Sequence, residues 1–404
     1  MARRCRRHYS KYSWLIHRST DLDVLTGPDR RPLARNLGWT VLALTLLAVV
    51  AMVLLRPGNP PDVSGFGFAP EVLSARVTSV VEGSCSFGED LVCRRATFEL
   101  LEGPDVGTTT FEEWELIPSA PQFSVGDRVV LNRIPEAPAL QRYQFADRER
   151  RPLLIGAGLF FSALVIVLGR LRGLAALGGL ILSIGVLLLY IVPAILSGRS
   201  PELVALTGGM LIAVCALYLA HGNRPTTHVA AIGTFASLGL TVGLGALAMR
   251  IADFSGLVSE EAGFLMGIGG IDLRGLLLAG IMLGALGALD DVTVTQASAV
   301  SEVAVANPAL DDAGLYAAGM RVGRDHVAST INTLLLAYAG AAMPLLLLFG
   351  LSGQELGIVA NSEVVAVEIV RTLVGSIGLV AAVPITTWLA AKVVANRFGR
   401  PESS

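Results

Sequence analysis

The chain has 404 residues, of which 53% are apolar and 16% are charged, and its mean hydropathy is +0.62. This composition excludes an ordinary soluble domain and predicts an integral membrane protein whose main partner is the lipid bilayer. The formal net charge of -2 says nothing about partners by itself, because charge in a membrane chain matters by position, and no feature indicates nucleic-acid binding.

The N-terminal segment, residues 1–36, contains eight arginines and one lysine. The first apolar run follows at 37–55, and ~20 apolar residues suffice to cross a bilayer. The sequence RPGNPPDV after this run offers no small-residue cleavage site. We therefore expect an uncleaved transmembrane anchor behind an Arg-rich cytoplasmic segment.

Residues 56–151 differ in kind, because charged residues occur throughout and short alternating stretches lie between turn signals. The stretches are VLSARVTSV, ATFEL and DRVVLNRI, and the turns are marked by Gly83, Gly103-Pro104 and Gly126-Asp127. Such alternation is typical of strands. The segment is predicted to be a small extracytoplasmic β-rich domain of about five strands, either an OB-like barrel or a sandwich.

Cys85 and Cys93 lie in this domain, in the sequence SCSFGEDLVC. A tight turn centred on Gly88 can bring the two thiols together, and an extracytoplasmic compartment permits their oxidation. The pair is therefore a disulfide candidate. The alternative, two free or buried thiols, stays open.

Seven further apolar runs follow Pro152, at 152–169, 173–196, 202–220, 229–249, about 275–290, 329–350 and 373–391. With the first run they predict an all-α polytopic bundle of about eight transmembrane helices, with a seven-helix membrane domain over 152–395 and a tail at 396–404. The stretch 250–274 contains FLMGIGGIDL, which is too short to cross and predicts a surface or re-entrant helix.

The basic residues of the short connections fall on the side of the N-terminus: Arg170, Arg172, Arg224, Arg321, Arg324, Lys392, Arg397 and Arg400. The positive-inside rule therefore predicts a multi-pass protein of the cell membrane with both termini and the tail in the cytoplasm. Arg148, Arg150 and Arg151 oppose this orientation. They follow a long translocated domain, which weakens the rule.

The candidate functional site is a pair of polar stripes in residues 276–348. At ~100° per residue, four polar residues of the first stripe share one arc of a helix. They are Asp291, Thr295, Ser298 and Glu302. Asn307, before Pro308, is predicted to cap the next helix. That helix carries the second stripe, consisting of Arg321, Asp325, Ser329 and Asn332, with Arg324 beside it.

Two such stripes on consecutive helices are expected to face each other or a shared water-filled cavity, because ionisable groups at membrane depth are costly unless paired or hydrated. Arg321 or Arg324 would then neutralise Asp291 or Asp325. The prediction is a substrate or ion pathway. The alternative is a hairpin that projects into the cytoplasm, where the stripes are only solvated faces.

The chain lacks a P-loop and the HExxH, GxSxG and redox CxxC motifs. His221 and His228 flank the short turn HGNRPTTH, but a metal site would need further ligands that the sequence does not show. No metal and no cofactor are therefore expected.

Three stretches resemble the YibE/F family of bacterial multi-span membrane proteins: GALGALDDVTVTQASAVSE, AAGMRVGRDHVASTINTLLLAYAG and VRTLVGSIGLVAAVPIT. The likeness covers most of 71–391. It matches Asp291 to the family's acidic residue and leaves Asp290 as an additional one. The family is described as transport or permease proteins on topology alone. The resemblance therefore implies a bundle in the bacterial inner membrane, supports the hairpin as the site and names no substrate.

The leading functional hypothesis is a secondary transporter or permease of unknown substrate, coupled to protons or a cation through intramembrane Asp residues. A second hypothesis is a non-catalytic assembly or sensor protein whose β domain binds an envelope protein. A third is an intramembrane aspartyl-type enzyme in which Asp291 and Asp325 share a proton. An enzyme is the less favoured class, and the oligomeric state stays open.

Overall fold

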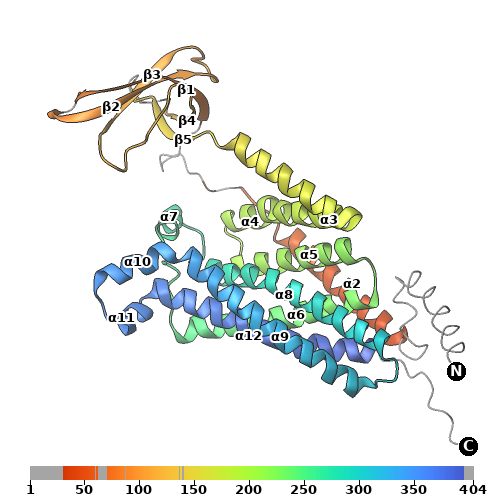
Figure 1. Ribbon diagram of the computed structural model, residues 1–404. Helices are drawn as coiled ribbons and strands as arrows, with labels where there is room; N and C mark the ends of the chain where they lie inside the picture. Colours follow the sequence, from red (N-terminus) through yellow and green to blue (C-terminus); the bar gives the residue numbers. More distant parts are fainter. Residues whose placement is uncertain are drawn as a thin grey trace, which may run out of the picture. The chain divides into compact units, whose positions relative to one another are not determined.

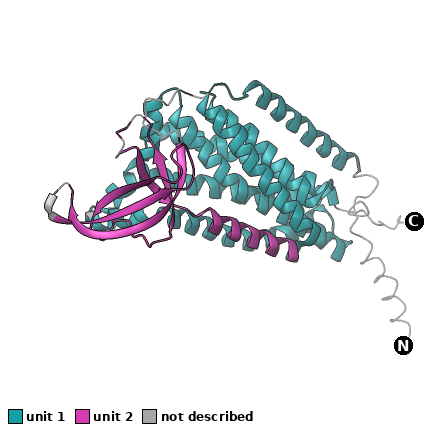
Figure 2. Ribbon diagram, turned by 90° about the horizontal axis from the view of Figure 1, so that it is seen from above, with its two compact units in different colours: residues 1–61, 168–404 teal, residues 62–167 magenta. Residues whose placement is uncertain are grey.

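The computed structural model describes residues 31–59, 61, 71–86, 88–135, 137–138 and 141–394. The chain forms two compact units, residues 62–167 and residues 1–61 with 168–404 (Figures 1 and 2). The predicted fold class is confirmed, because one unit contains a five-stranded β domain and the other a bundle of apolar helices. Most of the predicted Arg-rich segment and the tail at 396–404 lie outside the described residues.

The β domain is one antiparallel sheet in the order β3-β2-β1-β4-β5. Its strands are β1 (Glu71–Cys85), β2 (Gly88–Leu100), β3 (Thr109–Glu115), β4 (Arg128–Arg133) and β5 (Tyr143–Arg148). Strand β1 is long enough to pair with two partners, with β2 over Ala75–Cys85 and with β4 over Glu71–Arg76. It therefore forms the centre of the sheet.

The sheet curls until its two edge strands meet. Glu112 of β3 accepts a hydrogen bond of 2.6 Å from the Phe145 N–H of β5, and the rings of Trp114 and Phe145 lie edge to face with centroids 5.8 Å apart. Alternate residues of the strands fill the interior, among them Leu73, Ala75, Val77, Ala96, Phe98, Val129 and Leu131. Of the two predicted architectures, this single curled sheet is a partly open barrel and not a sandwich.

The helical elements are α2 (Arg31–Leu54), α3 (Arg151–Val186), η3 (Leu187–Ile191), α4 (Val192–Leu196), α5 (Pro201–His221), α6 (Pro225–Ile251), α7 (Glu260–Ile268), α8 (Leu273–Ala306), α9 (Asp312–Ala341), α10 (Met343–Ser352), α11 (Leu356–Asn361) and α12 (Glu363–Val394). Among the described residues, 6 helices are long and apolar enough to cross a membrane. The number is 7 if α9 and α10, bent by 64°, form one span. The chain is a multi-pass membrane protein.

The predicted number of eight differs because 151–196 forms one helical element of 46 residues. At ~1.5 Å per residue it measures about 69 Å, more than twice the ~30 Å hydrocarbon core. The element is interrupted at Arg170, whose φ of 51° and ψ of -127° are not helical. This interruption lies between the two runs predicted as separate spans.

The turn between α8 and α9 corrects one predicted cap. Asn307 is the C-cap of α8, and the N-cap of α9 is Asp311, whose side chain accepts a hydrogen bond of 2.8 Å from the Gly314 N–H. The prediction for Asn307 was wrong because residues 307–310 are needed to reverse the chain. A carboxylate at Asp311 suits the positive end of the helix dipole.

One end of the bundle brings distant segments of the chain together. Ala34 of α2, Val229 of α6, Ala304 of α8, Leu315 of α9 and Val394 of α12 belong to one buried cluster. The start of α2, the start of α6, the α8–α9 turn and the end of α12 therefore lie at the same end of this unit.

Candidate functional site

The length of α5 allows the depth of neighbouring residues in the membrane to be estimated. Its 21 residues are about 31 Å long at ~1.5 Å per residue, which matches the ~30 Å hydrocarbon core. Gly209, near the middle of α5, lies against Leu286 of α8, because a Cβ on Gly209 would be 3.3 Å from Leu286 Cδ2. With α5 taken as one complete crossing, Leu286 of α8 lies near the mid-depth of the hydrocarbon core.

Asp290 and Asp291 lie about 6 and 8 Å from this mid-depth along α8, well inside the core. Their surroundings differ because neighbouring residues point about 100° apart on a helix. Asp291 is exposed, whereas Asp290 is partly buried. The Asp290 Oδ1 atom is fully enclosed and has no hydrogen-bond partner among the described residues. The structure thus places one acid inside the bundle and one on its surface.

A layer of threonines lies one turn from Asp290, where α6, α8 and α12 meet. Thr234 of α6 and Thr293 of α8 share a hydrogen bond of 2.7 Å, and both are fully buried. Thr386 of α12 lies against Gly233 of α6, where any Cβ would overlap its hydroxyl. The glycine lets the helix backbones approach closely, which is how helices associate in lipid.

A second polar layer joins α8, α9 and α12. The Gln296 side chain of α8 is 2% exposed, and its Nε2 donates to the Gly319 carbonyl at 2.8 Å and to Thr387 Oγ1 at 2.7 Å. Gly323, one turn after Gly319, leaves room for the amide, because a Cβ there would lie 3.0 Å from Gln296 Oε1. Buried amides and hydroxyls therefore run through the centre of the bundle.

Further hydroxyl groups in this interior have no hydrogen-bond partner among the described residues. They belong to Thr227, Ser237, Ser301, Ser376 and Thr386. A buried hydroxyl without a partner costs ~1–3 kcal/mol. These groups, with Asp290, can bind water or a polar solute at little further cost.

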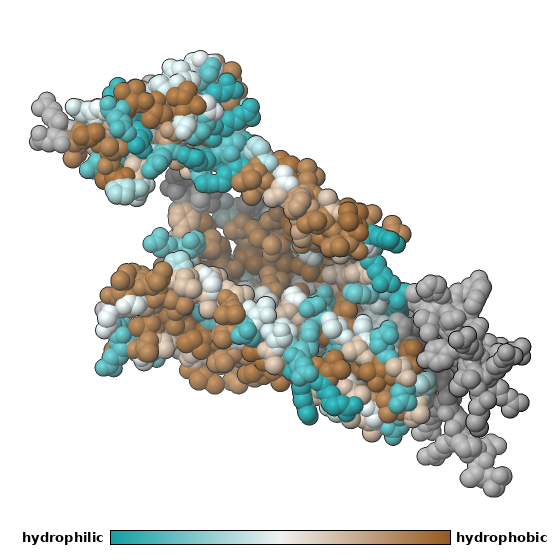
Figure 3. All heavy atoms as spheres, in the orientation of Figure 1, coloured by the Kyte–Doolittle hydropathy of each residue, from teal (hydrophilic) through white to brown (hydrophobic). Residues whose placement is uncertain are grey.

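All nine residues predicted as the pathway are exposed, namely Asp291, Thr295, Ser298, Glu302, Arg321, Arg324, Asp325, Ser329 and Asn332. They lie on the outer face of the α8–α9 hairpin, and Figure 3 shows hydrophilic side chains over this part of the surface. Among the described residues, no ion pair joins Arg321 or Arg324 to an aspartate of the stripes. The pathway assignment stays a prediction.

The stripes predicted from the sequence do not include the buried polar face of α8, which contains Thr293 and Gln296. A signal for this face was present, because it is lined with small residues, among them Ala285, Ala297, Ser301 and Ala304. Small residues are enriched at helix interfaces in lipid, because they let the helix backbones approach closely.

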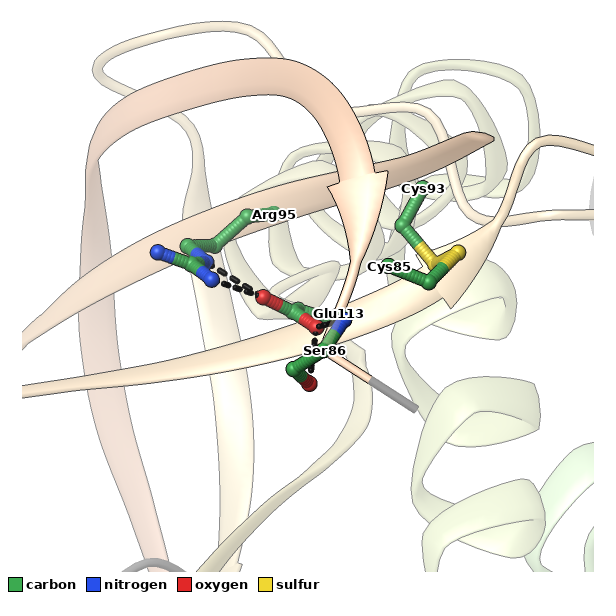
Figure 4. The surroundings of a disulfide bond; sticks show 5 residues. All are labelled: Cys85, Ser86, Cys93, Arg95 and Glu113. Carbon is green, nitrogen blue, oxygen red and sulfur yellow. Dashed lines mark hydrogen bonds and ion pairs between the residues drawn. A yellow bond between two sulfur atoms is a disulfide. The ribbon is translucent and has the colours of Figure 1, made fainter. Parts of the chain in front are cut away.

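The β domain carries a covalent link at one end of its central hairpin. Cys85 and Cys93 are joined by a disulfide, with their Cα atoms 4.9 Å apart. Beside it, the Ser86 N–H and hydroxyl donate to Glu113 Oε2 at 3.1 and 2.5 Å, and Arg95 binds the other carboxylate oxygen (Figure 4). The contacts tie the hairpin to β3 and are structural in character.

Within the described residues, no group of three or more His, Cys, Asp or Glu side chains is placed to hold a metal ion. His228 instead makes a hydrogen bond of 2.6 Å between its Nδ1 and the Tyr218 hydroxyl. It also lies against Gly38 of α2, where a Cβ would be 3.1 Å from His228 Nε2. This histidine therefore packs α2, α5 and α6 together.

A family model described as YibE/F-like protein matches residues 157–396, which is more than half of the chain. The match covers the bundle from α3 to the end of α12 and includes both polar layers and both stripes. No curated protein and no solved structure matches the chain.

Proposed function

The chain belongs to the YibE/F-like protein family, and on that premise we propose that it is a secondary transporter or permease coupled to protons or to a cation. The observation that carries the proposal is the enclosed Asp290 Oδ1, which has no hydrogen-bond partner among the described residues. An ionised carboxylate at this depth is costly unless it is compensated. Taking up a proton or a cation removes that cost, so occupancy of Asp290 can favour one state of the bundle.

The route to Asp290 is proposed along the two exposed stripes. Gln296 lies about 15 Å from mid-depth, at the edge of the core, and its bond to Gly319 sets α9 at the same level. From there α9 runs back toward the middle of the membrane. Asp325 lies about 6 Å before mid-depth, and Asn332 lies slightly past mid-depth. The stripes therefore run from the α8–α9 turn to the middle of the membrane.

We place the protein in the bacterial cytoplasmic membrane with the α8–α9 turn and both termini in the cytoplasm. Support comes from the basic connections and from the shared end of α2, α6 and α12 under the positive-inside rule. In this orientation residues 56–151 are extracytoplasmic and the stripes open toward the cytoplasm.

A second candidate function is an assembly or sensor protein. It is favoured by the β domain, which is a compact unit of its own and exposes Val81 and Val92 near the disulfide, at 59% and 53%. An envelope protein would be its partner. The aspartyl-type enzyme gains no support, because Asp291 and Asp325 are both exposed, whereas a shared-proton pair needs enclosure.

Flux through proteoliposomes tests the transport proposal. The purified chain is reconstituted with a pH-sensitive dye inside, and proton movement is followed under imposed sodium, potassium and pH gradients. Asp290→Asn should abolish coupled flux and Asp291→Asn should reduce it, whereas Glu260→Gln, an exposed acid on α7, should leave it unchanged. Wild-type vesicles without flux, or equal flux in wild type and Asp290→Asn, would refute the proposal.

A further inference from the structure

The exposed stripes of α8 and α9 carry charged side chains at membrane depth. Asp291 and Arg324 lie about 8 Å, and Asp325 about 6 Å, from the mid-depth of the bundle, yet all three side chains are exposed. A charged side chain inside the hydrocarbon core is costly unless it is paired or hydrated. A face with three such groups does not point to lipid.

The exposed residues of α8 independently indicate that this face is not covered by lipid. Between Asp291 and Glu302, every exposed residue of α8 is polar: Asp291, Thr295, Ser298 and Glu302. A helix that faces lipid exposes large apolar side chains, as α2 does with Leu47 and Val53, which are 65% and 63% exposed. This part of α8 therefore differs from a lipid-facing surface.

The charges of this face are arranged with opposite signs on the two helices. The stripe of α8 contains two acids and no base, whereas α9 presents Arg321 and Arg324 together with one acid, Asp325. A two-fold axis would bring α8 of one chain against α9 of the other, so that acids meet arginines twice. Such self-complementarity is the property that an isologous interface requires.

We propose that the face formed by the two stripes binds a second copy of this chain in a two-fold dimer. Thr295, Ser298, Ala328 and Ser329 are small and exposed on it, which allows the helices of two copies to approach closely. The ionic groups then pair across the interface instead of facing lipid. The inference rests on the depth and exposure of the stripes and does not depend on transport.

The test uses full-length chains with two different tags, co-expressed and purified in lipid nanodiscs. One variant carries Asp291→Arg and Glu302→Arg, which makes both helices basic. The other carries Arg321→Asp and Arg324→Asp, which makes both acidic. Each variant expressed alone should fail to co-purify its two tags, because like charges meet. The two variants expressed together should co-purify, which also shows that both fold.

The mass of the particle provides the second measurement. Wild type should show twice the 42.4 kDa of one chain after correction for lipid, and so should the mixed pair. Wild type that is monomeric at every concentration overturns the proposal. So does either variant that still pairs with itself. Wild-type protein that forms the dimer but shows no flux in proteoliposomes refutes only the transport proposal.

Discussion

Gln296 of α8 and Thr387 of α12 share a hydrogen bond of 2.7 Å across 91 positions of sequence. The Thr387 hydroxyl itself donates a hydrogen bond of 2.6 Å to the Val383 carbonyl, and the same Gln296 amide donates to the Gly319 carbonyl of α9. One side chain thereby holds three helices in register.

Thr387→Val should weaken the bundle, because it removes the hydroxyl between α8 and α12 while it keeps the volume of the side chain. Interhelical hydrogen bonds in membranes contribute about 0.6 kcal/mol on average and up to ~1.7, and we expect a loss in this range. The measurement is the unfolding free energy of the purified protein in mixed micelles. A double-mutant cycle with Gln296→Met isolates the pair, and a coupling energy of zero would contradict the bond.

Gly233→Ala should destabilise the protein more than Gly239→Ala, although both lie on α6. A Cβ on Gly233 would overlap the Thr386 hydroxyl and lie 3.4 Å from Thr293 Cγ2, whereas a Cβ on Gly239 meets nothing within 4 Å. Overpacking of this kind costs ~1–3 kcal/mol. Thermal unfolding in detergent compares the two variants, and adding Thr386→Ala to Gly233→Ala should restore part of the loss. Equal melting temperatures for the two glycine variants would show that the contact between Gly233 and Thr386 is not tight.

The stability of the β domain should depend on pH with opposite signs at two neighbouring acids. Hydrogen bonds from the Ser86 hydroxyl and N–H, aided by Arg95, lower the pKa of Glu113. Its stabilising effect is therefore present above the unfolded pKa of about 4.3 and is lost as the pH falls through the lower folded pKa. Burial raises the pKa of Glu112, against a hydrogen bond from the Phe145 N–H. Its ionisation therefore reduces stability as the pH rises through the higher folded pKa.

Glu113→Gln should thus reduce hydrogen-exchange protection of β3 at pH 7 and have a smaller effect at pH 4. Glu112→Gln should increase protection at pH 7, because the amide oxygen still accepts from Phe145 without a buried charge. Exchange is measured by mass spectrometry on the full chain and corrected for the intrinsic rate. Glu115→Gln, exposed on the same strand, is the control. If protection of β3 at pH 7 changes in the same direction in both variants, the two carboxylates do not have opposite effects on stability.

Alkylation should distinguish the disulfide from the free cysteine of α5. In protein purified without reductant and then denatured, we expect a thiol reagent to modify Cys215 but not Cys85 or Cys93, because Cys215 is free and the other two are joined. After reduction Cys85 and Cys93 should react as well. The joint variant Cys85→Ser with Cys93→Ser should lower β-domain stability by ~2–3 kcal/mol, the loop-entropy value for so short a loop. Mass spectrometry that finds Cys85 and Cys93 modified before reduction would contradict the disulfide.

Much of the architecture was predictable from local pattern. The apolar runs indicate the class because a helix of ~20 apolar residues crosses the hydrocarbon core and satisfies its own backbone groups there. The alternation in 56–151 indicates the β domain, and the five strands at 71–148 lie within the predicted boundaries. The N-cap of α9 was harder to predict, because Asn and Asp are both favourable N-cap residues. The path of the α8–α9 turn determines that Asp311, and not Asn307, is the N-cap.

The face of α8 that turns inward could not be predicted in the same way. Helical periodicity groups Asp291 with Thr295 and Glu302, and it also groups Thr293 with Gln296, but it does not say which group is buried. That choice depends on Gly233 of α6 and on Gly319 of α9, which lie far away in sequence and open space for the second group.

The sequence by itself therefore determined that this chain is a multi-span membrane protein with an inserted β domain, because hydropathy and alternation are local properties. Only the tertiary structure decided that Asp290 points into the bundle and Asp291 out of it. The two carboxylates are chemically identical and adjacent, so their difference lies in the packing of other helices around α8. Burial is a property of those neighbours, and the hydropathy of two adjacent aspartates does not contain it.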